Sequence, residues 1–226
     1  AIAMLAFAWF AVPESLPREH RHTGGMRAMA SSFAHFARDR VYLGYAAVYA
    51  CGFSALMAYV SASPFVGQSV LGMSPLLYGL GFAGGGSALL VANLTNARLA
   101  PRFGPERMLV IGATLGLTSA VVMTAASLFG LLSIPLFLAC AFTTMGSAGL
   151  TFGNASALGL SRATPRNRGA GAALMGAAQF AGGAAVTPIV GLWGEHTALP
   201  MACAMLVGTA ASLTLAVASN ARLRRR

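Results

Sequence analysis

The side chains that could do chemistry in this chain are aromatic rings and amides that lie within long apolar runs. Tyr45, Tyr49 and Phe53 are spaced four residues apart, so they fall on one face of a helix. Rings stack on other rings, and phenols and amides hydrogen-bond, which suits the binding of a small amphipathic molecule. The candidate contacts of a substrate cavity are Tyr45, Tyr49, Phe53, Asn154 and Gln179.

Each of these candidates has a structural alternative. A tyrosine hydroxyl in a membrane helix needs a protein or water partner, and the depth of Tyr45 and Tyr49 favours a cleft over an interfacial belt. For Asn154 and Gln179, a hydrogen bond to a neighbouring helix is the more frequent role, and a ligand contact is the alternative.

Catalytic and metal chemistry lack the residues that they would need. None of the apolar runs carries an Asp, Glu, Lys, Arg or His well inside it, so no intramembrane proton relay is visible. The histidines that share one polar segment have no companion serine motif, and the three cysteines have no CxxC or histidine-spaced partner. We therefore expect no catalytic residue, no metal site and no cofactor, and the protein is not expected to be an enzyme.

The elements that position these side chains are indicated by the basic residues. All fifteen are arginines, and they fall in four clusters that separate the apolar runs two at a time. The gaps near 63–74, 130–133 and 194–198 hold none. Loops that stay on the cytoplasmic side of a membrane retain arginine, so this alternation predicts a chain that crosses a bilayer repeatedly.

Composition supports the same class. Hydrophobic residues make up 57% of the chain and charged residues 9%, against roughly 25% charged residues in soluble domains. The net charge of +10 does not favour a nucleic-acid partner, because long apolar runs separate the arginines. We expect the arginines to control topology and to contact the anionic headgroups of the lipid bilayer.

Six apolar stretches are long enough to cross the hydrocarbon layer as helices. They are 41–62, 75–97, 108–129, 134–160, 170–193 and 199–219. With the arginine clusters inside, residues 220–226 form a basic cytoplasmic tail. The fold class expected is an all-α membrane protein with a six-helix bundle over 41–219.

The segment before the bundle divides in two. Residues 1–12 look like the end of a preceding transmembrane helix, and 13–40 like a central cytoplasmic loop. Within that loop, apolar side chains from Met26 to Phe36 recur at helical spacing, which indicates a short helix in the inner headgroup layer. A solvated linker is the equally weighted alternative.

Glycines and one arginine-rich turn mark two further features. Three glycine pairs are four residues apart, Gly81 and Gly85, Gly112 and Gly116, Gly149 and Gly153, a spacing that lets helix backbones approach closely. The turn from Asn96 to Arg107 contains Gly104 for a chain reversal. We expect its arginines to cap helix carbonyls and to engage nearby acids.

Several segments together resemble the Bcr/CflA branch of drug:proton antiporters in the major facilitator superfamily. Tyr59–Val66, Gly72–Pro75 and Asn96–Leu99 are similar to its seventh and eighth helices. The segments similar to the end of its sixth helix and to its tenth and eleventh helices are Pro13–Pro17, Phe152–Leu158 and Gly171–Gln179.

The resemblance implies the C-terminal half of a twelve-helix exporter in the cell membrane, with the C-terminus cytoplasmic. The partners implied are the N-terminal six-helix half, protons and an amphipathic substrate held between the halves. On this pattern 41–62 and 134–160 line the cavity, while 108–129 and 199–219 face lipid. The candidate gating loop comprises Asn93, Arg98, Arg102, Gly104 and Arg107, although no acid precedes Arg98 as the family motif requires.

The expected function is therefore proton-coupled efflux of drugs or antibiotics by alternating access between two halves. Two alternatives stay open from the residues alone. One is a transporter of another substrate class, such as a metabolite or sugar. The other is a membrane scaffold that transports nothing.

Overall fold

The computed structural model describes residue 7 and residues 25–165, 167–191 and 197–224. Seven α-helices and one π-helical segment occur within them, and no strand does. The elements are α2 (Gly25–Arg38), α3 (Arg40–Phe65), η2 (Val66–Val70), α4 (Pro75–Phe103), α5 (Pro105–Leu128), α6 (Ile134–Leu160), α7 (Arg168–Gly191) and α8 (Leu199–Arg224).

Six helices are long and apolar enough to cross a membrane, with α3 and η2 together forming the first of them. The expected all-α class and the six spans are confirmed. The predictions for residues 1–12 and for Pro13–Pro17 lie outside the described part of the chain, apart from Phe7.

Helix ends differ from the predicted ones on the arginine side. The expected span 75–97 continues to Phe103, and the expected span 199–219 continues to Arg224. Hydrophobicity marks only the part of a helix that matches the hydrocarbon layer, whereas backbone hydrogen bonds and the good helix propensity of arginine carry the helix further. Much of the expected basic loop and tail is therefore helical.

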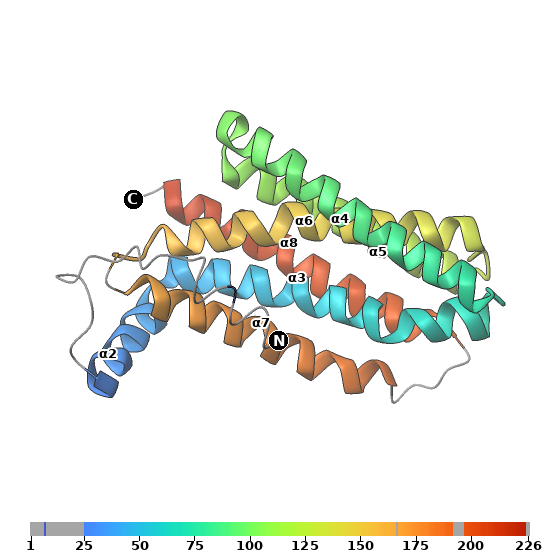
Figure 1. The fold of residues 1–226 in the computed structure, drawn as a ribbon, viewed down its shortest axis with the longest axis horizontal. Helices are drawn as coiled ribbons and strands as arrows, with labels where there is room; N and C mark the ends of the chain where they lie inside the picture. The colour runs from blue at the N-terminus through green and yellow to red at the C-terminus, as the bar shows by residue number, and fades with distance from the viewer. Residues whose placement is uncertain (1–6, 8–24, 166, 192–196, 225–226) are drawn as a thin grey trace.

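The helices pack around a central pair, α3 and α6 (Figure 1). Helix α4 packs mainly on α6, and α7 packs almost entirely on α3. Helices α5 and α8 pack on each other, and each also packs on one central helix, α5 on α6 and α8 on α3. The order α4, α6, α3, α7 thus forms one layer, and α5 and α8 cover one side of it.

This packing has internal symmetry. Exchanging the set α3, α4, α5 for the set α6, α7, α8 leaves the pattern of close helix neighbours unchanged. Because each set has three crossings, the second set enters the membrane from the opposite side. The arrangement is that of an inverted repeat.

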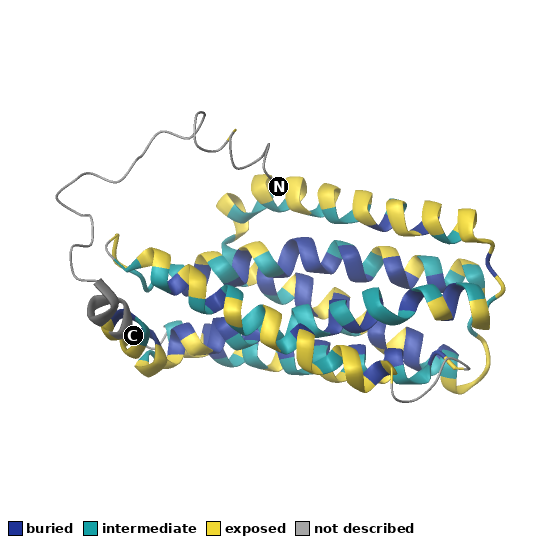
Figure 2. Cartoon of the chain, turned by 60° about the horizontal axis from the view of Figure 1, so that its bottom comes forward, coloured by how far each residue is buried: buried dark blue, intermediate teal, exposed yellow. Residues whose placement is uncertain are grey.

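Burial is concentrated in the inner helices. Buried positions follow α3, α5 and α6 closely, whereas α4 and α7 expose most of their length (Figure 2). The exposed side chains of α4 are largely apolar, Leu76, Leu80, Leu90, Val91 and Leu94 among them. Such surfaces need lipid or another apolar protein surface against them.

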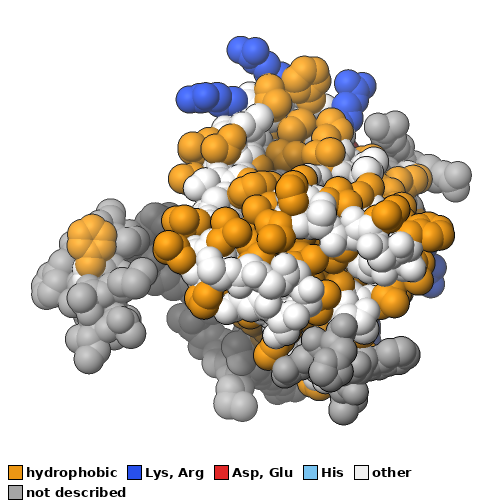
Figure 3. All heavy atoms as spheres, turned by 90° about the vertical axis from the view of Figure 1, so that its right-hand side faces the viewer, with side chains coloured by type: hydrophobic (Ala, Val, Ile, Leu, Met, Phe, Trp, Pro, Cys, Tyr) orange, Lys and Arg blue, Asp and Glu red, His pale blue; other side chains and the backbone are white. Residues whose placement is uncertain are grey.

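The two ends of the bundle differ in charge. The described arginines lie at helix ends on the left of Figure 1, where α3, α5 and α7 begin and α4, α6 and α8 end. Among the described residues, the opposite end shows hydrophobic and uncharged side chains, and arginines appear only at the margin of that view (Figure 3). This distribution matches the charge alternation in the sequence.

The glycine pairs lie at helix contacts, as their spacing predicted. Gly81 and Gly85 of α4 face side chains of α6, and Gly112 and Gly116 of α5 face α6 as well. Gly149 of α6 directly faces the α4 backbone, and an added Cβ there would lie 2.9 Å from the Leu89 carbonyl oxygen. These glycines let α4 and α5 approach the central helix α6.

The segment before the first span contains a helix rather than only a linker. Helix α2 packs on the start of α7, and the Phe36 ring at its end is buried against Tyr42. The Tyr42 hydroxyl in turn donates to the Gly171 carbonyl of α7 at 2.6 Å. These contacts hold α2, α3 and α7 together at the arginine-rich end of the bundle.

Candidate functional site

An aromatic cluster lies where α3, α6 and α7 meet. Tyr49 and Phe53 of α3 contact the Phe152 ring of α6, with ring centroids 5.1 and 6.0 Å apart. Phe53 also meets Phe180 of α7 edge-on at 5.6 Å. We call these four side chains the aromatic cluster.

The cluster is open on one side. Its three inner rings are half-buried, whereas 67% of Phe180 is exposed. Within the described residues, no hydrogen-bond partner reaches the Tyr49 hydroxyl. Edge-on rings with a free phenol present π faces, ring edges and one hydrogen-bonding group, which together suit a flat amphipathic molecule.

Tyr45 does not belong to this surface. Its side chain is 0% exposed, and its hydroxyl donates to the Asn220 amide oxygen of α8 at 2.8 Å. The Asn220 amide nitrogen then donates to the Glu106 carbonyl at the start of α5. This corrects the expectation of a cavity contact, because the chain of hydrogen bonds places Tyr45 in the packing of α3, α8 and α5.

The two candidate amides have different settings. Asn154 is 3% exposed, and its amide nitrogen donates to Asn96 of α4 at 2.7 Å and to the Leu150 carbonyl. The structure thus shows the interhelical hydrogen bond, not an open contact. Gln179 is half-buried on α7 next to Phe180, and no described residue hydrogen-bonds to its amide. It stays a candidate contact.

The candidate gating loop is a one-residue turn. Gly104 joins α4 to α5 with a φ of 86°, a conformation that favours glycine, as the sequence predicted. Arg98, Arg102 and Arg107 are exposed around it. Among the described residues none of the three forms an ion pair or caps a carbonyl, contrary to expectation. Asn93 is also exposed and donates to the Leu89 carbonyl of its own helix.

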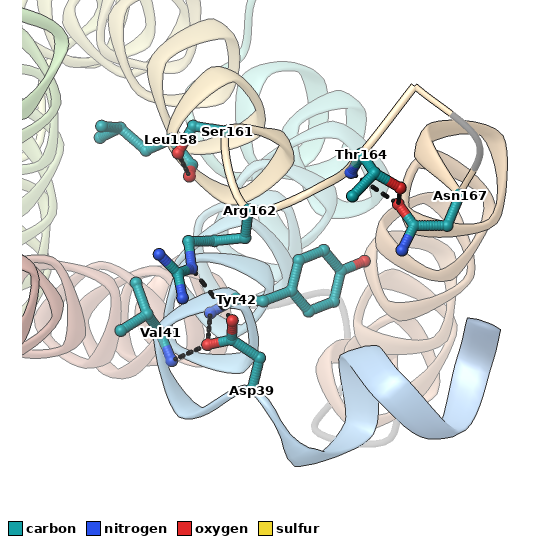
Figure 4. A network of polar contacts seen from close by, with 8 residues as sticks. All are labelled: Asp39, Val41, Tyr42, Leu158, Ser161, Arg162, Thr164 and Asn167. Atoms are coloured by element: carbon teal, nitrogen blue, oxygen red, sulfur yellow. Dashed lines mark hydrogen bonds and ion pairs between the residues drawn. The ribbon is translucent and has the colours of Figure 1, made fainter. Parts of the chain in front are cut away.

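An ion pair forms instead between the start of α3 and the end of α6 (Figure 4). The Arg162 Nε lies 3.0 Å from Asp39 Oδ2. Asp39 also caps α3, because its other carboxylate oxygen accepts from the backbone N–H groups of Val41 and Tyr42. One carboxylate thus orders a helix start and holds a second helix end beside it.

The local charges favour the ionised carboxylate. Burial raises the pKa of Asp39, but the hydrogen bonds from Arg162, Tyr42 and Val41 and the guanidinium charge outweigh it, so the pKa is lowered below its usual value. The ion pair is therefore formed throughout the neutral range. Beside it, Asn167 closes the turn before α7 by accepting from the backbone and the hydroxyl of Thr164 (Figure 4).

Replacing Asp39 with asparagine should lower stability at neutral pH and leave it unchanged in strong acid. Asparagine still caps a helix, so the loss is that of the partly exposed ion pair, about 1 kcal/mol or less. Because the folded-state pKa is lowered, this contribution is present above the ordinary carboxyl value and is lost as pH falls through the folded value. Thermal unfolding of both proteins from pH 7 to pH 3 measures it.

A difference between the two proteins that is as large at pH 3 as at pH 7 would contradict this origin. Arg162→Gln serves as the matched variant, since it breaks the same pair from the other side. The double variant should then lose little more than either single one.

Sequence reasoning missed several of these residues. Phe152 and Phe180 are rings in apolar spans, so nothing in their type separates them from lipid-facing positions. Their positions relative to Phe53 follow only from the packing of α6 and α7 on α3. The Asp39–Arg162 pair joins residues 123 apart in the chain, a distance that no local pattern bridges.

A model described as Major Facilitator Superfamily matches residues 1–188 of the chain. The chain belongs to the major facilitator superfamily. It is thus a multi-pass membrane protein of a transporter family, in agreement with its six apolar helices.

Relatives within the superfamily include two bacterial proteins. The chain is 28% identical over 195 residues to the uncharacterized MFS-type transporter YdgK of Bacillus subtilis, covering 86% of this chain and 48% of that protein. It is 27% identical over 196 residues to a bicyclomycin resistance protein homolog of Haemophilus influenzae, covering 87% and 49%. The chain spans about half the length of these relatives, and the resemblance to the Bcr/CflA branch is supported at low identity.

Proposed function

We propose that this chain is the C-terminal half of a proton-coupled exporter of amphipathic drugs or antibiotics. The observation that carries the proposal is the aromatic cluster, which is half-open on the layer formed by α4, α6, α3 and α7. Family membership supports transport, and the similarity to a bicyclomycin resistance protein homolog supports an antibiotic substrate.

The layer of α4, α6, α3 and α7 is proposed to face a second six-helix half. Its outer members expose apolar surface along most of their length, whereas α5 and α8 cover the opposite side and would face lipid. Substrate would then lie between the halves, against Tyr49, Phe53, Phe152, Phe180 and Gln179. Rocking of the halves would expose this surface to each side of the membrane in turn.

Proton coupling is proposed to depend on the other half. The described parts of the six spans carry no ionisable side chain well inside the membrane other than tyrosine and cysteine. Carboxylates and histidines are the usual carriers of protons in transporters. The same proposal places the protein in the cell membrane with its arginine-rich end and C-terminus in the cytoplasm, in contact with anionic headgroups.

Efflux of a fluorescent amphipathic cation tests the proposal in cells that express the full-length protein. Cells should retain several-fold less dye than cells with an empty vector, and a protonophore should abolish the difference. Efflux that persists when the proton gradient collapses would contradict proton coupling. Equal retention with and without the protein, at confirmed membrane insertion, would contradict drug export.

A further inference from the structure

A small cavity lies inside the bundle where α3, α5, α6 and α8 meet. Its volume is about 20 Å³, and a cavity of roughly 10–15 Å³ holds one water molecule. Five of its twelve lining residues carry hydroxyl groups, and the other seven are glycines or apolar residues. The hydroxyl-bearing residues that line it are Thr144, Ser147, Thr151, Thr209 and Ser212.

One of these hydroxyls differs from the others. Thr151 is 4% exposed, and no described residue hydrogen-bonds to its hydroxyl. The remaining four are each satisfied: Thr144 pairs with Ser119 of α5, and Ser147, Thr209 and Ser212 donate to backbone carbonyls. A buried hydroxyl is almost always hydrogen-bonded, to protein or to ordered water.

Glycines let the α5 backbone approach two of these hydroxyls closely. A Cβ at Gly112 would lie 2.7 Å from Thr151 Oγ1, and one at Gly116 would lie 2.9 Å from Ser147 Oγ. Gly52 of α3 lines the cavity from the other side. Glycines at 112 and 116 thus place the α5 backbone close to the Thr151 and Ser147 hydroxyls.

We propose that this cavity binds one structural water molecule. The Thr151 hydroxyl donates to the water oxygen, and the water donates its two hydrogens to hydroxyl oxygens of Ser147, Thr209 or Ser212. Those oxygens already use their own hydrogens on carbonyls, but each retains lone pairs that accept. Three hydrogen bonds are the usual number for a buried water, and the water joins α6 to α8.

The lining favours water over a cation. Every side chain around the cavity is uncharged, and the nearby carbonyls that accept from hydroxyls belong to helices. A buried cation would need carboxylates or several free carbonyls to replace its hydration shell. The ligand is therefore a neutral donor and acceptor of hydrogen bonds.

A high-resolution structure of the full-length protein and one thermal-unfolding comparison test the site. The density should show an ordered oxygen within hydrogen-bond distance, about 2.5–3.0 Å, of Thr151 Oγ1 and of a second hydroxyl. A Thr151 side chain turned to bond its own helix carbonyl, with no ordered oxygen beside it, would overturn the proposal.

The thermal unfolding midpoint of Thr151→Val distinguishes a cavity with bound water from one without it, because the midpoint shifts in opposite directions in the two cases. If water is bound, Thr151→Val removes a hydrogen bond and lowers the unfolding midpoint by about 2–4 °C. If it is not, valine relieves an unsatisfied hydroxyl and the midpoint rises. Thr124→Val is the matched control, because that buried hydroxyl donates to the Ala120 carbonyl away from the cavity. A fall as large as the control's supports the water, and a smaller fall or a rise overturns it.

Measuring the unfolding midpoint in sodium chloride and in choline chloride distinguishes a bound sodium ion from a bound water molecule. The shift caused by Thr151→Val should be the same in both salts. A shift that appears only in sodium would assign the cavity to the cation and overturn the assignment to water.

Discussion

Replacing Gly149 with valine should detach α4 from α6 and prevent the half-bundle from folding stably. An added Cβ at this position would lie 2.9 Å from the Leu89 carbonyl oxygen, 2.9 Å from Ala92 Cβ and 3.2 Å from the Asn93 amide nitrogen. Two of these atoms belong to the α4 backbone, so no rotamer change relieves the contact. Overpacking of this kind costs about 1–3 kcal/mol for a small addition and more for a branched side chain.

The effect is amplified because α4 has few other attachments. It packs mainly on α6, and its contacts with α5 are sparse. Displacing it also stretches the hydrogen bond between Asn154 and Asn96, which lies one to two turns further along. Interhelical hydrogen bonds of this kind contribute about 0.6 kcal/mol on average.

Gly146→Ala is the control for this prediction. Gly146 is on the same helix, three residues earlier, but the nearest atom to its added Cβ is the Ala88 carbonyl oxygen at 4.0 Å. That distance is ordinary van der Waals contact, so alanine should be tolerated. Thermal unfolding of the purified variants measures both, and equal stability of Gly149→Val and Gly146→Ala would contradict the assigned contact.

Replacing Phe53 with alanine should weaken drug transport about tenfold while leaving insertion intact. Phe53 contacts both Phe152 and Phe180, so its removal takes the central ring from the aromatic cluster. Each aromatic pair contributes about 0.5–1.5 kcal/mol beyond its buried area. Without Phe53, the substrate loses one aromatic contact, and the Phe152 and Phe180 rings lose the ring that holds them in place. We expect the binding free energy of the substrate to weaken by roughly 1.4 kcal/mol, a factor of ten in affinity.

The measurement is the concentration dependence of efflux, with the amount of inserted protein checked in the same cells. Phe129→Ala is the control, because that ring is 76% exposed at the end of α5 and lies outside the cluster. Phe53→Leu should recover packing but not ring stacking. If Phe53→Ala and Phe129→Ala transport equally well, the cluster is not the contact surface.

Much of the fold could be predicted from the sequence because lipid imposes simple rules. The span lengths follow from the thickness of the hydrocarbon layer, and the alternation of arginine-rich and arginine-free gaps follows from topology. The turn at Gly104 and the contacts of Gly112 and Gly149 also have local causes that spacing reveals. The ends of helices in the headgroup layer could not be predicted in this way, because the hydrophobicity of the sequence falls before the helix ends.

The candidate site was harder to predict for a physical reason. The sequence of α3 is apolar all round, so it does not reveal which neighbour each side chain of the helix faces. Tyr45 and Tyr49 are one turn apart, yet the first faces α8 and the second faces Phe152 of α6. Asn154 likewise meets Asn96 only because glycines bring α4 and α6 together.

The packing of α4 and α7 has a mechanical consequence. Helix α4 packs mainly on α6 and α7 mainly on α3, while the other four spans share neighbours with one another. A small tilt of either flanking helix would therefore break fewer helix contacts than a tilt of any other span. The inner helices α3, α5, α6 and α8 are thus held by several neighbours, whereas each edge helix of the layer is held mainly by one.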